Sequence, residues 1–242
     1  MYKFDDVTIA YDKNNVIFES LNLEFKSGEI TGLIGKSGCG KSTILKSFFD
    51  LNLIKKGDLL NDNKAISMLS KSQLKSYKNL ISYIDPNGLA LQEVDSFTNI
   101  IQSFNNYKNY FYKLFKWLTP KQLISLWSLF DKFELKDHAL SSIKDLSSGQ
   151  KQRFAIIQAI FRKFDLLLAD EPTSNLDINS TKKVFDTFLD LKENNKTVVV
   201  AIHDLEAAFN YCDKIYAIKD GQVQQVFYKD NYQKQELEKY FD

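Results

Sequence analysis

Cysteine is scarce in this chain, and its two cysteines, Cys39 and Cys212, do not form the spaced framework of a disulfide-stabilised protein. We therefore expect no structural disulfide, and a reducing cytosol fits this composition. Long apolar runs are missing as well, since none approaches the roughly 20 residues that a membrane-spanning helix needs. The first residues also lack the basic and apolar regions of a signal peptide. Any membrane role is therefore expected to come through a partner.

A strong net charge is also absent. The 32 basic and 31 acidic residues leave a formal charge of +1, and only two of the basic residues are arginines, Arg153 and Arg162. This balance argues against a general nucleic-acid surface, because neutralising phosphates requires a basic patch. With 242 residues, of which 44% are hydrophobic, the chain is long enough for one large domain or for one domain with an inserted subdomain.

Glycine is concentrated in one place, because five of the nine glycines lie between Gly28 and Gly40. The stretch that begins at Gly35 follows the apolar run 30–34, leads into a helix-like segment at 42–49, and fits the pattern G-x-x-x-x-G-K-[ST]. Such a loop turns backbone N–H groups toward phosphate oxygens, Lys41 adds a full positive charge, and Ser42 can ligate Mg²⁺. An ordinary glycine-rich turn is the less favoured alternative. The predicted phosphate loop consists of Gly35, Lys36, Ser37, Gly38, Cys39, Gly40, Lys41, Ser42 and Thr43.

Two further apolar runs end in polar residues that suit phosphate chemistry. Residues 166–169 are typical of a buried parallel strand and lead into Asp170 and Glu171, which could hold Mg²⁺ through water and polarise an attacking water. Alternatively, the two carboxylates merely begin the next loop. The strand predicted at 197–202 ends at His203, which is placed to donate to a phosphate oxygen. His138 has no such context and is interpreted as a solvated helix residue.

A third polar motif is the pentapeptide Leu146, Ser147, Ser148, Gly149 and Gln150, which precedes a helical run at 151–161. Its hydroxyl and amide groups would lie at a helix N-terminus, where anions are favoured. As an isolated pentapeptide it is a weak signal.

The remaining segments predict the architecture around these motifs. Alternating apolar residues at 7–10 and 21–25, and a hairpin signal at 57–66, indicate an antiparallel β region. Tyr11, at the end of the first strand, could stack on a base or simply pack against its neighbours. A short strand at 80–84 runs into the turn sequence 85–88. Helices are predicted at 120–133 and 178–193, and two strands near the C-terminus, at 214–219 and 222–227.

The segment 96–138 is rich in aromatic residues and has helical periodicity. Five of its apolar residues fall on one face of a predicted helix: Tyr107, Tyr110, Phe111, Leu114 and Leu118. Packing of this face within a helical subdomain is the favoured interpretation. The alternative is a docking surface for another protein, which is indicated by Tyr112, Phe115 and Trp117 beside the apolar face.

Taken in order, these motifs resemble the ATP-binding subunit of an ABC transporter over essentially the whole chain. The phosphate loop is similar to Walker A, residues 165–171 to Walker B, 146–150 to the LSGGQ signature, 174–177 to the D-loop and His203 to the switch histidine. The aromatic insertion is most similar to that of phosphonate-type importer ATPases, whose relatives are linked to thiamine uptake. The resemblance implies a single α/β domain over 1–242: a P-loop NTPase core with a mainly parallel sheet, an antiparallel β subdomain and a helical subdomain inserted at about 96–150.

The resemblance also implies ATP and Mg²⁺ as cofactors and a head-to-tail homodimer that binds ATP between the two copies. The phosphate loop would hold the phosphates, Tyr11 would stack on adenine, and Ser42 and Asp170 would organise Mg²⁺. Glu171 would act as the general base and His203 would contact the γ-phosphate. Residues 147–150 of the signature would complete the partner's site.

Three features depart from the pattern of the family or occupy variable places in it, and the third consists of Lys36 and Cys39 in the phosphate loop. After the strand at 80–84 the family has a glutamine, where this chain has Asp85 and Pro86, and we hypothesise that Asp85 takes over part of the metal contact. Ser148 stands where glycine is usual, which would slow dimer closure if this position needs a positive φ. Cys39 lies beside a helix N-terminus and is predicted to be an activated thiol whose alkylation blocks nucleotide binding.

The implied partners are transmembrane permease subunits on separate chains and a substrate-binding protein, with no nucleic acid. The implied location is peripheral, at the cytoplasmic face of the cell membrane. Two other functions stay open: a soluble ATPase of the same superfamily that acts on ribosomes or DNA, and a nucleotide-gated module with little hydrolysis. The first usually carries two ATPase modules or a long coiled coil, and Glu171 counts against the second.

Overall fold

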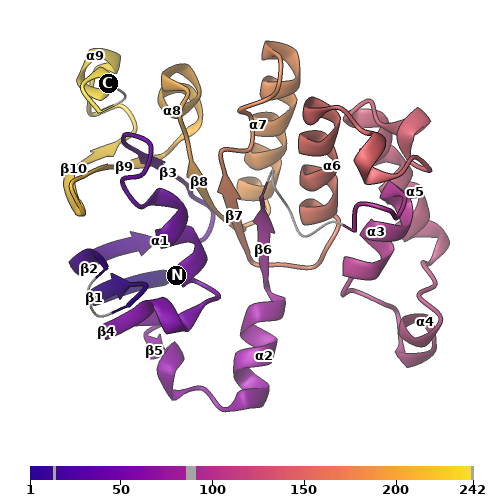
Figure 1. The fold of residues 1–242 in the computed structure, drawn as a ribbon, viewed down its shortest axis with the longest axis horizontal. Coiled ribbons are helices and arrows are strands. Elements are labelled where there is room, and N and C mark those ends of the chain that lie inside the picture. Colours follow the sequence, from indigo (N-terminus) through magenta and orange to yellow (C-terminus); the bar gives the residue numbers. More distant parts are fainter. Residues whose placement is uncertain (13–14, 86–90, 241–242) are drawn as a thin grey trace.

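The computed structural model describes residues 1–12, 15–85 and 91–240 and arranges them around two β-sheets (Figure 1). The larger sheet has six strands in the order β10-β9-β3-β8-β7-β6. Its strands are β3 (Ile30–Ile34), β6 (Ile81–Ile84), β7 (Leu166–Asp170), β8 (Thr197–Ala201), β9 (Lys214–Lys219) and β10 (Gln222–Tyr228). The pairs β6–β7, β7–β8, β3–β8 and β3–β9 are parallel, and β10 pairs antiparallel with β9. The sequence prediction of a mainly parallel sheet is confirmed.

The smaller sheet is antiparallel, with four strands in the order β2-β1-β4-β5. They are β1 (Tyr2–Ala10), β2 (Val16–Phe25), β4 (Ile54–Asn61) and β5 (Lys64–Ala65). The predicted hairpin around Asp62 and Asn63 is present, and both residues have a positive φ, as a tight turn requires. The antiparallel β region is therefore confirmed, although β2 begins earlier than the sequence pattern indicated.

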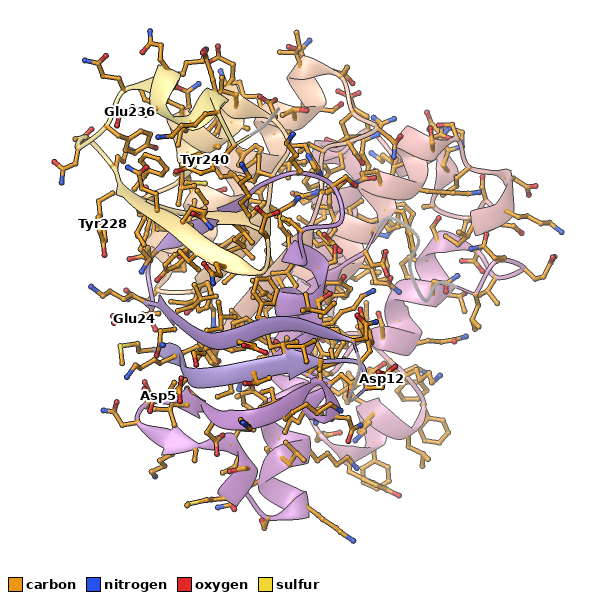
Figure 2. All side chains as sticks on the ribbon, turned by 60° about the vertical axis from the view of Figure 1, so that its left-hand side comes forward. Asp5, Asp12, Glu24, Tyr228, Glu236 and Tyr240 are labelled. Atoms are coloured by element: carbon orange, nitrogen blue, oxygen red, sulfur yellow. The ribbon has the colours of Figure 1, made fainter. Side chains whose placement is uncertain are left out.

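Helices cover both faces of the parallel sheet (Figure 1). They are α1 (Lys41–Ser47), α2 (Lys71–Asn79), α3 (Ser96–Ser103), α4 (Tyr110–Leu114), α5 (Pro120–Lys132), α6 (Ser148–Ile160), α7 (Ile178–Glu193), α8 (Leu205–Tyr211) and α9 (Lys234–Glu238). At the C-terminal end, Tyr240 lies near β10 and its ring contacts Phe227, while Tyr228 stands at the exposed edge (Figure 2). In the described residues, no helix combines the length and the hydropathy needed to cross a bilayer.

The alternation of side chains along β7 explains why the molecule has two hydrophobic cores. Leu166 and Leu168 face the core shared with α1 and the antiparallel sheet, whereas Leu167 and Ala169 face the core shared with α6 and α7. Successive strand residues point to opposite faces, so a strand that is buried on both sides must be apolar throughout. The continuous apolar run in the sequence is thus the consequence of a strand covered on both faces.

The helices between β6 and β7 form the helical insertion that the sequence predicted. Helix α5 begins where expected, with Thr119 as its N-cap, Pro120 in its first turn and a reciprocal capping box between Thr119 and Gln122. Two ion pairs on the surface join α7 to the C-terminal end of α5 and the residues after it. Glu134 lies between Lys183 and Arg153, and Lys132 Nζ is 3.4 Å from Asp190 Oδ2.

One packing prediction is wrong. The apolar face expected from Tyr107 to Leu118 is not a buried helix face, because α4 is only five residues long and none of its residues is buried. Asn109 caps its start, and Lys116 adopts a positive φ just beyond its end. Tyr107 and Leu118 do pack against the core, but the residues between them project outward.

Candidate functional site

The glycine-rich loop connects the end of β3 to the start of α1. Gly35, Gly38 and Gly40 all have a positive φ, a conformation that side-chain-bearing residues avoid. A Cβ atom at Gly40 would lie 2.5 Å from a ring carbon of Phe18, and one at Gly35 would lie 2.2 Å from the carbonyl oxygen of Ile218. Both the backbone conformation and the close approach of neighbouring atoms therefore require glycine at these two positions.

Lys41 lies inside the curve of this loop. Its side chain is almost completely buried, and Nζ donates to the carbonyl oxygens of Gly35 at 2.6 Å and Lys36 at 3.0 Å. Cys39 Sγ is 3.9 Å from the same nitrogen. A buried cation whose nearest partners are two neutral carbonyl groups is well placed to receive an anion, because phosphate oxygens would supply the missing negative charge.

Asp170 joins the loop to the sheet through both of its carboxylate oxygens. Ser42 Oγ donates to Oδ1 at 2.9 Å, and the phenol of Tyr83 on β6 donates to Oδ2 at 3.1 Å. Burial raises the pKa of Tyr83, and the charge of Asp170 raises it further, so the phenol keeps its proton and acts as the donor. A hydroxyl and one carboxylate that converge beside a phosphate loop fit the oxygen ligands of Mg²⁺, which usually completes its shell with waters and substrate phosphates.

Glu171 and His203 meet at the carboxyl ends of β7 and β8. Their Oε1 and Nε2 atoms are 2.7 Å apart, and both side chains are partly exposed. Glu171 has a φ of 47°, an unusual conformation for a residue with a side chain. Its N–H donates to Ala201 O at 3.1 Å and its carbonyl accepts from Gln152 Nε2 at 2.9 Å, which hold the strained backbone in place.

The signature motif forms the start of α6. Ser147 is the N-cap, with a capping box in which Gln150 N donates to Ser147 Oγ at 3.3 Å and Ser147 N donates to Gln150 Oε1 at 2.8 Å. Ser148 is the first helical residue and has a negative φ, so the condition on which slower dimer closure was predicted, a positive φ, is not met in this structure. Gly149 approaches Asn175 closely, since an added Cβ would lie 3.0 Å from the Asn175 carbonyl oxygen.

The predicted site residues described so far fall into three groups, one of which is the Glu171–His203 pair. Lys41, Ser42 and Asp170 are connected to one another around the loop, and Tyr11 joins this group because its hydroxyl is 3.4 Å from Thr43 Oγ1. Residues 147–150 belong to the helical insertion, and among the described residues no hydrogen bond or ion pair links them to residues 35–43.

Asp85 follows β6 and lines a groove of about 740 Å³ between α1, α2, β6 and α6. Its predicted metal contact stays a prediction, and Pro86, which replaces the family's glutamine, lies outside the described residues. The groove is also lined by Lys46, Lys78 and Arg162. The Nε atom of Arg162 is buried in it without a hydrogen-bond partner, and burial lowers the pKa of this guanidinium.

Sequence reasoning missed three contributors to these groups. Tyr83 reaches Asp170 only because β6 pairs with β7, with Tyr83 opposite Leu168, and strand order cannot be read from local periodicity. Gln152 supports Glu171 from one turn into α6, a contact that requires the tertiary fold. His138 was expected to be solvated, but it is half-buried and its Nε2 is 2.8 Å from Gln150 Nε2 in the signature.

The chain is similar to one known family of proteins and to several of its members. The sequence profile of the ABC transporter family matches residues 18–174. The phosphonates import ATP-binding protein PhnC of Lactococcus lactis subsp. lactis (strain IL1403) is 31% identical over 225 residues, covering 92% of this chain and 91% of that protein. PhnC of Mesoplasma florum is 30% identical over 233 residues, covering 92% of each chain.

The fold is similar to that of a solved ATP-binding cassette, a dimer in a post-hydrolysis state bound to ADP and Pi. The TM-score is 0.83 with 26% identity, over 96% of this chain and all of that one. This likeness confirms the predicted P-loop NTPase fold.

Proposed function

Because this chain belongs to the ABC transporter family and is an ATP-binding ATPase of that family, we propose that it powers a membrane importer through the site built on Lys41. The observation that carries the proposal is the convergence of three features at one edge of the parallel sheet. A buried lysine lies within a glycine loop, Ser42 meets Asp170 beside it, and the Glu171–His203 pair stands at the neighbouring strand ends.

In this proposal, the loop binds the triphosphate and Lys41 exchanges its two carbonyl contacts for β- and γ-phosphate oxygens, with Thr43 as a further donor. Ser42 and Asp170 hold Mg²⁺, which supplies positive charge to the phosphates when bound. Glu171 accepts a hydrogen bond from the attacking water and orients it, while His203 Nε2 moves from Glu171 to a γ-phosphate oxygen. Phosphoryl transfer needs mainly positioning and charge stabilisation, and these residues provide both.

The site is completed by a second copy of the chain in a head-to-tail dimer. The hydroxyl of Ser147 and the amides at the start of α6 would face the γ-phosphate held by the partner's loop, where a helix N-terminus favours an anion. The similarity to a dimeric cassette supports this arrangement. In this view residues 1–242 form one ATPase domain, with the helical subdomain at about 96–150 carrying the signature.

Permease subunits would dock in the groove between α1, α2 and α6. The groove combines apolar walls with a buried guanidinium nitrogen of Arg162 that has no partner in the described chain. A carboxylate or carbonyl group of a permease segment would satisfy this donor, since leaving it unpaired is costly. Asp85 lies in the same groove, directly after β6. A permease bound in the groove would therefore lie beside this predicted metal contact.

We infer a phosphonate as the cargo from the names of the relatives, with thiamine as the second candidate. A separate substrate-binding protein would deliver it, and the permease would hold the ATPase at the cytoplasmic face of the membrane. Uptake of labelled phosphonate and labelled thiamine, compared between cells with the wild-type chain and with Lys41→Ala, tests this inference. Loss of phosphonate uptake alone is the expected result, and uptake of both compounds without functional Lys41 would overturn the importer proposal.

A further inference from the structure

Helix α4 and the residues directly after it carry an exposed apolar surface, which we call the α4 tip: Tyr110, Phe111, Leu114, Phe115 and Trp117. Their exposed fractions are 72%, 66%, 58%, 56% and 58%. Single exposed apolar side chains are common on protein surfaces, but a contiguous group of large ones marks a binding surface. Helix α4, which carries this group, lies beyond α3 and α5 and away from both sheets (Figure 1).

The α4 tip is an ordered feature. Phe115 and Trp117 stack with ring centroids 5.0 Å apart, and the backbone N–H of Trp117 donates to Tyr112 O at 2.8 Å. The segment is anchored on both sides. Tyr107 Oη donates to Ile101 O at 2.8 Å, and Gln122 Nε2 donates to Asn106 O at 2.7 Å. The aromatic side chains are therefore presented to solvent by a fixed backbone.

The charged residues of the chain segment that carries the α4 tip all have the same sign. No Asp or Glu occurs from Ser96 to Phe130, whereas this segment contains four lysines, Lys108, Lys113, Lys116 and Lys121. All four are exposed, and none takes part in the ion pairs found among the described residues, although Lys108 lies 5.7 Å from the ring centre of Tyr112. The rest of the chain contains 28 basic and 31 acidic residues, a formal charge of −3. Net positive charge therefore lies on the segment where the aromatic side chains are exposed.

We propose that the α4 tip binds directly to the surface of an anionic lipid bilayer. Tyrosine and tryptophan rings favour the interface between headgroups and acyl chains, and lysines attract anionic headgroups. Each lysine near such a surface strengthens binding about fivefold. The α4 tip is a projection and not a groove, which suits insertion between lipid headgroups better than the docking of a peptide or helix.

The position of the α4 tip is compatible with the groove described above. Asn105 Nδ2, just before α4, donates to Asn79 O at 2.9 Å and to Lys163 O at 3.0 Å, and the neighbouring residues Lys78 and Arg162 line the groove. The base of the α4 segment and the groove therefore lie close together. Lipid binding does not depend on the identity of the permease or of the cargo. It would be a direct contact with the membrane, whereas the sequence analysis expected membrane contact only through a partner.

Flotation of the purified chain with lipid vesicles tests the proposal without nucleotide or permease. Vesicles of phosphatidylcholine alone are compared with vesicles in which about a third of the lipid is phosphatidylglycerol. We expect the chain to float only with the anionic vesicles and to be released by high salt, because surface charge is screened. In a Trp127→Phe background, the single remaining tryptophan, Trp117, should shift its emission to shorter wavelength on binding.

Two pairs of variants separate the contributions. Phe115→Ser with Trp117→Ser should reduce binding at least tenfold, whereas Met68→Ser, which changes a still more exposed apolar residue on η2 (Ile66–Met68), should not. Lys113→Gln with Lys116→Gln should reduce binding about 25-fold, the product of two fivefold losses. The matched control, Lys182→Gln with Lys229→Gln, removes the same charge from exposed sites elsewhere and should bind as the wild type does.

Absence of flotation with anionic vesicles would overturn the proposal, as would equal losses in the test and control variants. Permease capture in detergent, without lipid vesicles, distinguishes a protein partner. If the Phe115→Ser, Trp117→Ser variant loses the permease there, the surface is a protein-docking site and the lipid proposal is wrong. Unchanged thermal unfolding of the serine and glutamine variants, expected because the side chains altered in them are exposed, ensures that a loss of binding is not a loss of fold.

Discussion

Replacing Tyr83 with phenylalanine should weaken Mg²⁺ binding about tenfold. The substitution removes one hydroxyl, the donor 3.1 Å from Asp170 Oδ2, and leaves the ring that packs 5.2 Å from Phe49. A hydrogen bond to a charged group contributes about 1.5 kcal/mol, which corresponds to about one factor of ten in affinity. Without it, the carboxylate can rotate away from the position where Oδ1 faces Ser42, and supporting contacts of metal ligands typically have effects of this size.

The measurement is ATP binding by equilibrium dialysis as a function of Mg²⁺ concentration, together with the Mg²⁺ dependence of phosphate release. The Mg²⁺ concentration at half-maximal effect should rise about tenfold in both, with little change at saturating Mg²⁺. Tyr77→Phe is the matched control, because Tyr77 Oη donates to the Phe48 carbonyl at 2.9 Å and has no contact with Asp170. That variant should lose stability but keep the wild-type Mg²⁺ dependence. An unchanged Mg²⁺ midpoint in Tyr83→Phe would refute the positioning role.

Three further predictions concern the loop and the carboxylate. Glu171→Gln should reduce phosphate release at least 100-fold while retaining ATP binding, and equal release rates would contradict its role toward water. Gly40→Ala should destabilise the chain in urea by about 1–3 kcal/mol more than Gly38→Ala, because both positions have a positive φ but only Gly40 abuts an aromatic ring. A thiol reagent should modify Cys39 and spare Cys212, whose thiol is fully buried with a raised pKa, and ATP should protect Cys39. Labelling of both thiols in the folded chain, or no protection by ATP, would reject the last prediction.

Local signals in the sequence predicted most of the side chains that the structure brings together at the proposed site. The glycine loop could be predicted because its residues are consecutive in the sequence. A positive φ and the close approach of neighbouring atoms require glycine at Gly35 and Gly40. Asp170 and His203 could be placed because each follows an apolar run, and the carboxyl ends of parallel strands lie at one edge of a sheet. In these segments, predicting the strand was therefore enough to predict where in the fold the polar side chain after it would lie.

The sequence was less informative where tertiary contacts decide. Tyr83 has the same local context as any strand residue, and only the pairing of β6 with β7 brings it to Asp170. The α4 segment has helical periodicity, yet Tyr110 and Phe111 are exposed because no neighbouring element covers this five-residue helix. Periodicity identifies an apolar face, but it does not identify what that face meets.

Glu134 and Lys132 form ion pairs with α7 at the boundary between the helical insertion and the helices that pack on the parallel sheet. The carboxylates of both pairs lie largely in water, where charge pairs are weak and screened by salt. The two pairs therefore add little to the attachment of the insertion, which rests on the apolar core that Phe130 and Phe133 share with Phe185 of α7. Added salt weakens the surface pairs and leaves this apolar attachment in place.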